Sequence, residues 1–242
     1  MTSGFGGAQQ RERRARPGWL LRSLIVAAGL GLWFFTQSLL GSRPLSPGDD
    51  VDGAMLSRND GLFQLTQPIN ESLHAHPNWA DGLLIFTSAV IDVLGIWLIL
   101  LSIFGRTMRP FVGLLMLFAL RQLMQALCAL PTPEGMIWRY PGLQSLLVTY
   151  HVANDFFFSG HTAIAVFGAT QLARIPRRGM LALGIAIAVL EIATVIVLRA
   201  HYTMDVFAGA VTALWVALVA DRVAPAVDRV IARWCERPAV SK

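Results

Sequence analysis

The stretch MLALGIAIAVLEIATVIVL, from Met180 to Leu198, decides the fold class of this chain. It contains one charged residue, Glu191, and an apolar run of about 20 residues is long enough to cross a bilayer as a helix. The chain of 242 residues is 55% hydrophobic and only 14% charged, whereas a soluble domain has roughly 25% charged residues. Five further apolar runs bring the predicted spans to six: Trp19–Leu40, Gly82–Phe104, Pro110–Leu130, Phe156–Ala173 and Met204–Ala220. The sequence therefore predicts an all-α, polytopic membrane protein, a bundle of six transmembrane helices.

The basic residues give this bundle an orientation. Most of the 20 Lys and Arg residues fall in the leader, the two short loops after the second and fourth runs, and the tail. The positive-inside rule places such segments in the cytoplasm, so both termini are expected there. The first run alternatively resembles a signal peptide, but its basic leader is long and no small-x-small cleavage site follows cleanly. The net charge is +5, and the basic residues flank apolar spans. This position favours anionic lipid headgroups over nucleic acid as their binding partner.

The chain divides into three predicted parts: a disordered basic leader (residues 1–18), the membrane domain (19–220) and a cytoplasmic tail (221–242). The loops expected inside are very short, so only the outer, non-cytoplasmic face has room for a site. Its first loop, 41–81, contains an amphipathic stretch from Gly61 to Leu73, an expected interfacial helix that Pro68 interrupts. Cys128 and Cys235 fall on opposite faces, so no disulfide is expected.

Two histidines and one aspartate meet at the expected outer face. His201 and Asp205 lie between the last two spans, and their i, i+4 spacing puts both on one side of a helix. The carboxylate can then fix the tautomer of His201 and leave its other ring nitrogen free as a nucleophile or base. His161 opens the fourth span and can protonate a leaving oxygen. These three residues form a minimal set for phosphoryl transfer.

Two other interpretations compete with this one. A histidine at a helix end near a membrane surface is often only an interfacial residue, and two histidines with a carboxylate can bind zinc. The shared face of the two histidines and their small, hydroxyl-bearing neighbours favour catalysis. Gly160, next to His161, allows close approach of a ligand to the backbone.

Longer motifs resemble a known family. The stretch DFFFSGHT, Asp155–Thr162, is similar to Asp-x-x-x-Ser-Gly-His-Thr, and HYTMDV, His201–Val206, is similar to His-Tyr-Thr-x-Asp-Val. Arg121 followed by Leu130-Pro131-Thr132-Pro133 is similar to an Arg and Leu-Pro-x-Pro at the end of a third span. Together these motifs resemble the type 2 phosphatidic acid phosphatase superfamily, within it the sphingomyelin synthase branch. The resemblance covers roughly the second half of the chain.

The resemblance implies a reaction in two steps without a cofactor or metal. His201, held by Asp205, would form a phosphohistidine with a phospholipid donor, while His161 acts as acid and then as base. It implies supporting roles for Asp155, Ser159, Gly160 and Tyr202. The acceptor would be a lipid alcohol, either ceramide or diacylglycerol.

The alternative within enzymes is a lipid phosphate phosphatase, in which water is the acceptor. That branch usually has Arg six residues before its second histidine, where this chain has Val195. In that branch the arginine holds a phosphate monoester, so its absence favours a less charged phosphodiester headgroup and hence a transferase. Arg139 and Arg199, which are expected on the outer face, can partly substitute for it. A non-catalytic transporter is the more remote alternative, and the short inner loops disfavour it. Nothing in the sequence indicates an oligomeric state.

Three ionisable residues fall inside the predicted spans at a similar depth: Asp92, Arg121 and Glu191. Because an unpaired charge in a bilayer is costly, we expect them to pair with one another. They either lock the helices together or line the pocket, where Asp92 or Glu191 would accept a proton from a lipid alcohol and Arg121 would contact a phosphate.

Overall fold

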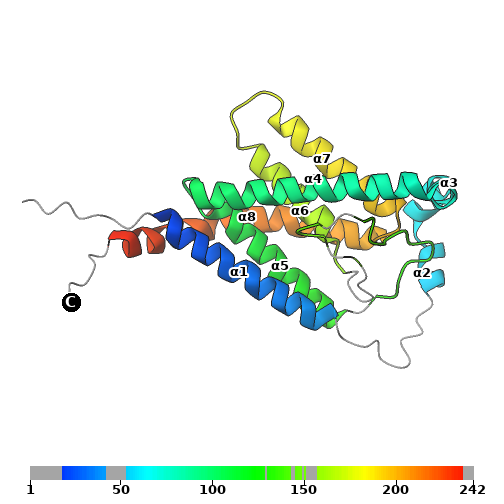
Figure 1. The fold of residues 1–242 in the computed structure, drawn as a ribbon, viewed down its shortest axis with the longest axis horizontal. Helices are drawn as coiled ribbons and strands as arrows, with labels where there is room; N and C mark the ends of the chain where they lie inside the picture. The colour runs from blue at the N-terminus through cyan, green and yellow to red at the C-terminus, as the bar shows by residue number, and fades with distance from the viewer. Residues whose placement is uncertain are drawn as a thin grey trace, which may run out of the picture.

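A computed structural model describes residues 18–41, 53–128, 130–142, 145–148, 150 and 157–236, and every regular element in this part of the chain is a helix. Five helices are long and apolar enough to cross a membrane (Figure 1): α1 (Gly18–Gly41), α4 (Pro77–Phe104), α5 (Arg109–Leu127), α7 (Met180–Val197) and α8 (Thr203–Glu236). The all-helical prediction is therefore confirmed for the described residues. Three shorter helices complete the set: α2 (Gly53–Arg58), α3 (Gly61–Ala75) and α6 (Gly160–Leu172).

The fourth predicted span is the exception. α6 has 13 residues, about 20 Å at 1.5 Å per residue, against a hydrocarbon core of about 30 Å. It lies among α4, α5, α7 and α8, and Ala165 and Phe167 at its middle are fully buried. α6 is thus a central helix, and the expected sixth span is not confirmed.

Small residues allow the neighbouring helices to approach α6 closely. A Cβ on Gly113 of α5 would meet the Phe167 ring at 2.0 Å, and one on Gly184 of α7 would meet the backbone of Ala169 at 2.8 Å. Close packing through small residues is the usual means by which helices associate in a bilayer. The glycines therefore fix the position of α6.

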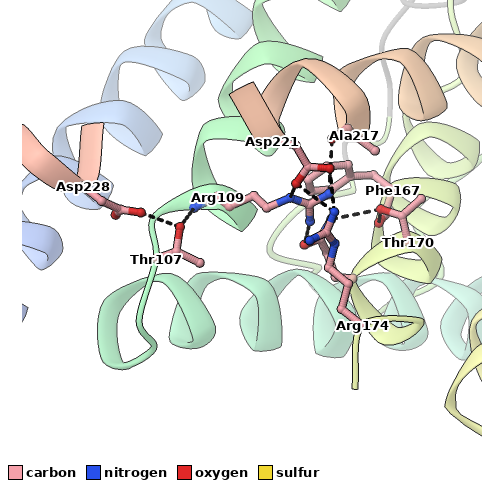
Figure 2. A network of polar contacts seen from close by, with 9 residues as sticks. Thr107, Arg109, Phe167, Thr170, Arg174, Ala217, Asp221 and Asp228 are labelled. Carbon is pink, nitrogen blue, oxygen red and sulfur yellow. Dashed lines mark hydrogen bonds and ion pairs between the residues drawn. The ribbon is translucent and has the colours of Figure 1, made fainter. Parts of the chain in front are cut away.

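A polar network joins α5, α6 and α8 at the end of the bundle that is expected to be the inner one (Figure 2). Arg109 is 6% exposed; its Nε donates to Asp221 Oδ1 at 2.5 Å, and its other nitrogens donate to Gln171 and to the Ala217 carbonyl. Arg174 donates to both oxygens of Asp221 at 2.6 and 2.7 Å. Two arginines thus share one carboxylate, and every part of the buried guanidinium has an acceptor, as burial of a charge requires.

A second carboxylate extends this inner end toward α1. Asp228 of α8 accepts from Thr107 Oγ1 at 2.6 Å and from the Met108 amide at 2.8 Å, and Arg22 of α1 lies 3.9 Å from it. α8 continues through Pro225 to Glu236, so residues 221–236 of the predicted tail are helical. The leader before residue 18 and the last six residues lie outside the described part of the chain.

The other end, expected to be the outer one, is built from α2, α3 and irregular chain. α3 forms where the amphipathic stretch predicts a helix, but it runs through Pro68 without interruption. Phe63, Asn70 and Leu73 on one face of α3 are buried, and Asn70 donates to the carbonyls of Gly135 and Val197. α3 is therefore docked on the bundle rather than free at the interface.

Asp92 holds a non-helical segment against α4. Its carboxylate accepts from the Ser145 hydroxyl and from the amides of Leu146 and Leu147, each at 2.9 Å. Leu147 packs onto Gly95, where a Cβ would meet it at 2.1 Å. Irregular backbone at this depth is tolerated when its polar groups are satisfied within the protein, and Asp92 satisfies them.

The expected pairing of the three intramembrane charges is therefore wrong. Asp92 binds the 145–148 segment, while Arg121 Nε donates to the Phe158 carbonyl at 3.0 Å. Glu191 is fully buried, and neither of its carboxylate oxygens has a hydrogen-bond partner among the described residues. The charges share a depth, but each belongs to a different part of the fold.

Candidate active site

One backbone hydrogen bond joins the two histidine motifs. The Ser159 amide, just before α6, donates to the Asp205 carbonyl in the first turn of α8 at 3.1 Å. Gly209, one turn further along α8, makes room for this contact, because a Cβ there would lie 2.7 Å from the Ser159 carbonyl oxygen. The start of α6 thus packs directly on the start of α8, which brings His161 to the same region as His201 and Asp205.

His201 lies in the turn before α8 rather than on the helix. Its Nδ1 is 3.8 Å from Asp205 Oδ2, which is an ion-pair distance and too long for a hydrogen bond. The same Oδ2 accepts from the Tyr202 amide at 3.0 Å. Asp205 is fully buried, and its Oδ1 has no hydrogen-bond partner among the described residues. The Tyr202 amide therefore holds the carboxylate with Oδ2 toward the imidazole.

His161 lies in the first turn of α6, where Ser159 is the N-cap and accepts from the Thr162 amide at 3.4 Å. Its Nε2 is buried without a hydrogen-bond partner among the described residues, and the imidazole interacts electrostatically with both His201 and Arg121. A buried ring nitrogen without a hydrogen-bond partner costs free energy. A bound substrate would supply the missing partner.

Arg121 reaches the start of α6 from α5. Its guanidinium lies over Gly160, where a Cβ would be 3.1 Å from Nε and 3.4 Å from Cζ. The cation and the N-terminal end of α6 both favour an anion at this point. Of the three intramembrane charges, Arg121 is the one beside His161.

An aromatic group covers the other side of His161. The Trp138 ring meets the imidazole edge to face at 5.1 Å, and Tyr150 lies 5.6 Å from Trp138 and 6.0 Å from Tyr140. Ser88 of α4 hydrogen-bonds to the Tyr150 hydroxyl at 2.6 Å, and burial raises the pKa of this phenol. These loop aromatics therefore reach the histidine through Trp138.

The remaining predicted residues lie further out or deeper. Arg199 donates to the Glu134 carbonyl at 2.8 Å and lies over the Phe63 ring at 5.2 Å, so it faces the α3 side. Glu191 of α7 is fully buried, and neither of its carboxylate oxygens has a hydrogen-bond partner among the described residues. Thr162 Oγ1 is also buried without a partner among the described residues. Asp155 lies outside the described residues.

Asp60 is a site residue that the sequence analysis missed. It caps α3 by accepting from the amides of Leu62 and Phe63, and it also binds Thr203, whose amide donates to Oδ2 at 2.7 Å and whose hydroxyl donates to Oδ1. An aspartate just before an apolar-periodic stretch is the sequence signal of an N-cap. The second role, toward the 201–205 turn, has no local signal.

Tyr202 has a structural position next to the catalytic candidates. Its hydroxyl donates to the Pro131 carbonyl at 3.1 Å and its ring stacks on Phe63 at 5.8 Å. Burial raises the pKa of the phenol, against the hydrogen bond from Ser57. Tyr202 thus ties the turn to the Leu-Pro-Thr-Pro segment and to α2.

Among the described residues, no three His, Cys, Asp or Glu side chains gather as metal ligands. A family model described as AtPDCT1/2 matches residues 59–222, from the residue before Asp60 to the middle of α8. No curated protein and no solved structure matches. The match overturns the resemblance to the type 2 phosphatidic acid phosphatase superfamily and its sphingomyelin synthase branch, and it lends no support to ceramide as an acceptor.

Proposed function

The chain belongs to the AtPDCT1/2 family, a family of headgroup-transferring membrane phosphotransferases, and from this premise we propose that it transfers phosphocholine from phosphatidylcholine to diacylglycerol. The observation that carries the proposal at the level of residues is the Ser159–Asp205 backbone contact, which joins the two histidine motifs. We further propose that the reaction takes place at the non-cytoplasmic face.

In the first half-reaction, His201 attacks the phosphorus of phosphatidylcholine. A P–N bond forms and the P–O bond to the glycerol oxygen breaks. Protonated His161 donates its proton to that oxygen, which releases diacylglycerol. Asp205 stabilises the positive charge on the His201 imidazole from 3.8 Å, as an orienting carboxylate does in other nucleophile sites.

The second half-reaction reverses these steps with another diacylglycerol. His161, now neutral, takes the proton of the acceptor hydroxyl, whose oxygen attacks phosphorus. The new O–P bond forms as the P–N bond breaks, and His201 leaves as the neutral base. Arg121 and the N-terminal end of α6 stabilise the phosphate oxygens in both directions, an electrostatic effect that is strong in a dry site.

The aromatic group accounts for the choline part. A quaternary ammonium group cannot donate a hydrogen bond, and aromatic faces are its usual partners in proteins. Trp138 contacts His161, so its ring and those of Tyr140 and Tyr150 lie beside the proposed phosphate position. We assign the trimethylammonium group to this aromatic group.

The test uses the purified full chain in liposomes with phosphatidylcholine and a diacylglycerol of different chain length. We expect phosphatidylcholine that carries the chains of the added diacylglycerol, and loss of at least 100-fold in rate for His161→Ala and His201→Ala. His76→Ala is the matched control, because His76 is exposed and stacks on Trp79 outside the site. An acid-labile phosphocholine adduct should be detectable on His201 in the unaltered chain and absent from His201→Ala. Transfer that survives both site substitutions would refute the proposal.

A further inference from the structure

A cavity of about 440 Å³ lies directly beside Asp205. Its walls come from Leu56 of α2, Cys128 and Leu130 at the outer end of α5, and Met204 at the start of α8. Its volume is in the range of pockets that hold small ligands, about 300–1,000 Å³. The cavity is separate from the aromatic group beside His161, so the mechanism described above leaves it unused.

The chemistry of the walls selects hydrocarbon. Most of the lining surface is apolar. The carboxylate of Asp60, which also lines the cavity, is already occupied by the Thr203 hydroxyl and amide and by the first amides of α3. A charged headgroup placed there would lose its hydration without a partner, at a high cost. Asp205 also lines the cavity, so the cavity adjoins the candidate active site.

The rim of the cavity faces away from the protein. Met204 is 66% exposed and Leu56 is 37% exposed, and α8 is one of the helices long and apolar enough to cross a membrane. A lipid can therefore enter from the surrounding bilayer, with its chains against the apolar wall and its glycerol oxygen near Asp205 and His201.

We propose that this cavity binds the diacylglycerol moiety, and that one such site serves donor and acceptor in turn. The inference rests on the proposed function. In the first half-reaction the glycerol oxygen leaves phosphorus and receives a proton from His161; in the second, an identical oxygen loses a proton to His161 and bonds to phosphorus. Both steps require the glycerol oxygen at the same position relative to His161 and phosphorus. One diacylglycerol site is therefore sufficient for both half-reactions.

Cys128 provides the test, because the chain has only two cysteines. In a Cys235→Ser, His201→Ala background, Cys128 is the single thiol and turnover is blocked. The rate at which N-ethylmaleimide modifies Cys128 is measured in detergent, with and without dioleoylglycerol, dioleoylphosphatidylcholine or glycerophosphocholine. We expect both diacyl lipids to slow modification at least 5-fold, and glycerophosphocholine to have no effect.

The matched control moves the thiol by one residue. Leu127 is 73% exposed on the same helix end and does not line the cavity, so Leu127→Cys with Cys128→Ser should show no protection. Equal protection at both positions, or protection by glycerophosphocholine alone, would overturn the proposal.

A second variant tests the cavity in the active protein. Cys128→Phe fills it and should raise KM for dioleoylglycerol at least 10-fold, with a smaller effect for dioctanoylglycerol; Leu127→Phe should leave both unchanged. An unchanged KM in Cys128→Phe would also count against the cavity. Failure of the proposed function and failure of this inference give different results. Protection of Cys128 without any transfer would refute the proposed function, whereas transfer without protection would refute only this inference.

Discussion

Asp60 holds the starts of two helices with one carboxylate. It caps α3 and also accepts the amide and the hydroxyl of Thr203, the first residue of α8. Removal of the Asp60 carboxylate leaves several backbone donors without an acceptor. Each such donor that is buried lowers the free energy of unfolding by about 1–3 kcal/mol. Since His201 and Asp205 flank Thr203, Asp60 is a positioning residue for the catalytic turn.

We expect Asp60→Ala to lower kcat for headgroup transfer about 10-fold or more with little change in KM for diacylglycerol. The histidine and the carboxylate lose their relative position, whereas the lipid cavity keeps its apolar walls. Steady-state kinetics in mixed micelles measure the split. Asp60→Asn retains one acceptor oxygen and should recover part of kcat. A rise in KM with unchanged kcat would mean that Asp60 acts in lipid binding instead.

The residue types of the site are readable from sequence, whereas their contacts are not. His161, His201 and Asp205 stand out because their spacing and their hydroxyl-bearing neighbours suit phosphoryl chemistry. The structure brings the motifs together through the Ser159 amide and the Asp205 carbonyl, two backbone atoms with no signature in the sequence. The role of Asp92 is not readable from the sequence: an acid within a span indicates function by default, yet here it accepts hydrogen bonds from the amides of a loop.

At the scale of elements, the contact between α6 and α8 brings the two histidine motifs of the site together. Gly209 allows it, because any side chain there meets the Ser159 carbonyl at 2.7 Å. Backbone cannot move away as a flexible side chain can, so α6 and α8 would have to separate.

Gly209→Ala should therefore reduce transfer about 10-fold or more and lower the thermal unfolding temperature. Gly31→Ala in α1 is the matched control, since a Cβ at Gly31 meets nothing within 4 Å. Activity assays and thermal unfolding in detergent read out both effects. If Gly209→Ala and Gly31→Ala have the same activity and the same unfolding temperature, the close approach of α6 to α8 is not needed for transfer.

The long helices were predictable because hydrophobic length is a property of the sequence alone. α6 was predicted to cross the membrane because its residues are apolar, but those residues face neighbouring helices rather than lipid, as Ala165 and Phe167 show. Composition cannot separate a buried helix from a spanning one. Pro68 was expected to interrupt α3, but the packing of its buried face against the bundle overrides local propensity.

For the whole molecule, the inner polar network sets the stability of the bundle. Asp221 neutralises Arg109 and Arg174 together (Figure 2). Arg109 is buried but the Asp221 side chain is 39% exposed, so loss of Asp221 costs less than the roughly 3–5 kcal/mol of a fully buried pair, although the Arg109 charge stays buried. Asp221 lies near the middle of α8, about 27 Å along the helix from the candidate site at its start.

Asp221→Ala should thus lower the thermal unfolding temperature strongly while the surviving folded protein keeps its KM for both lipids. Arg222→Ala, a change at an exposed neighbour, should leave stability unchanged. Unfolding is followed by tryptophan fluorescence, and kinetics are measured well below the transition. A changed KM at full stability would assign this inner end a part in substrate access.

The short length of α6 makes membrane thickness a variable of the reaction. The helix that carries His161 spans about 20 Å, so a lipid phosphate has to descend toward it, or the bilayer must thin locally, at a cost that grows with each ångström of mismatch. With trace substrates in host phosphatidylglycerol bilayers of increasing chain length, transfer should slow as the host thickens and should be independent of host chain length in detergent. A flat response would mean that the protein brings its substrate down without deforming the bilayer. If the rate does fall, then the lipid composition of a membrane tunes this protein through mechanics, with no effector bound.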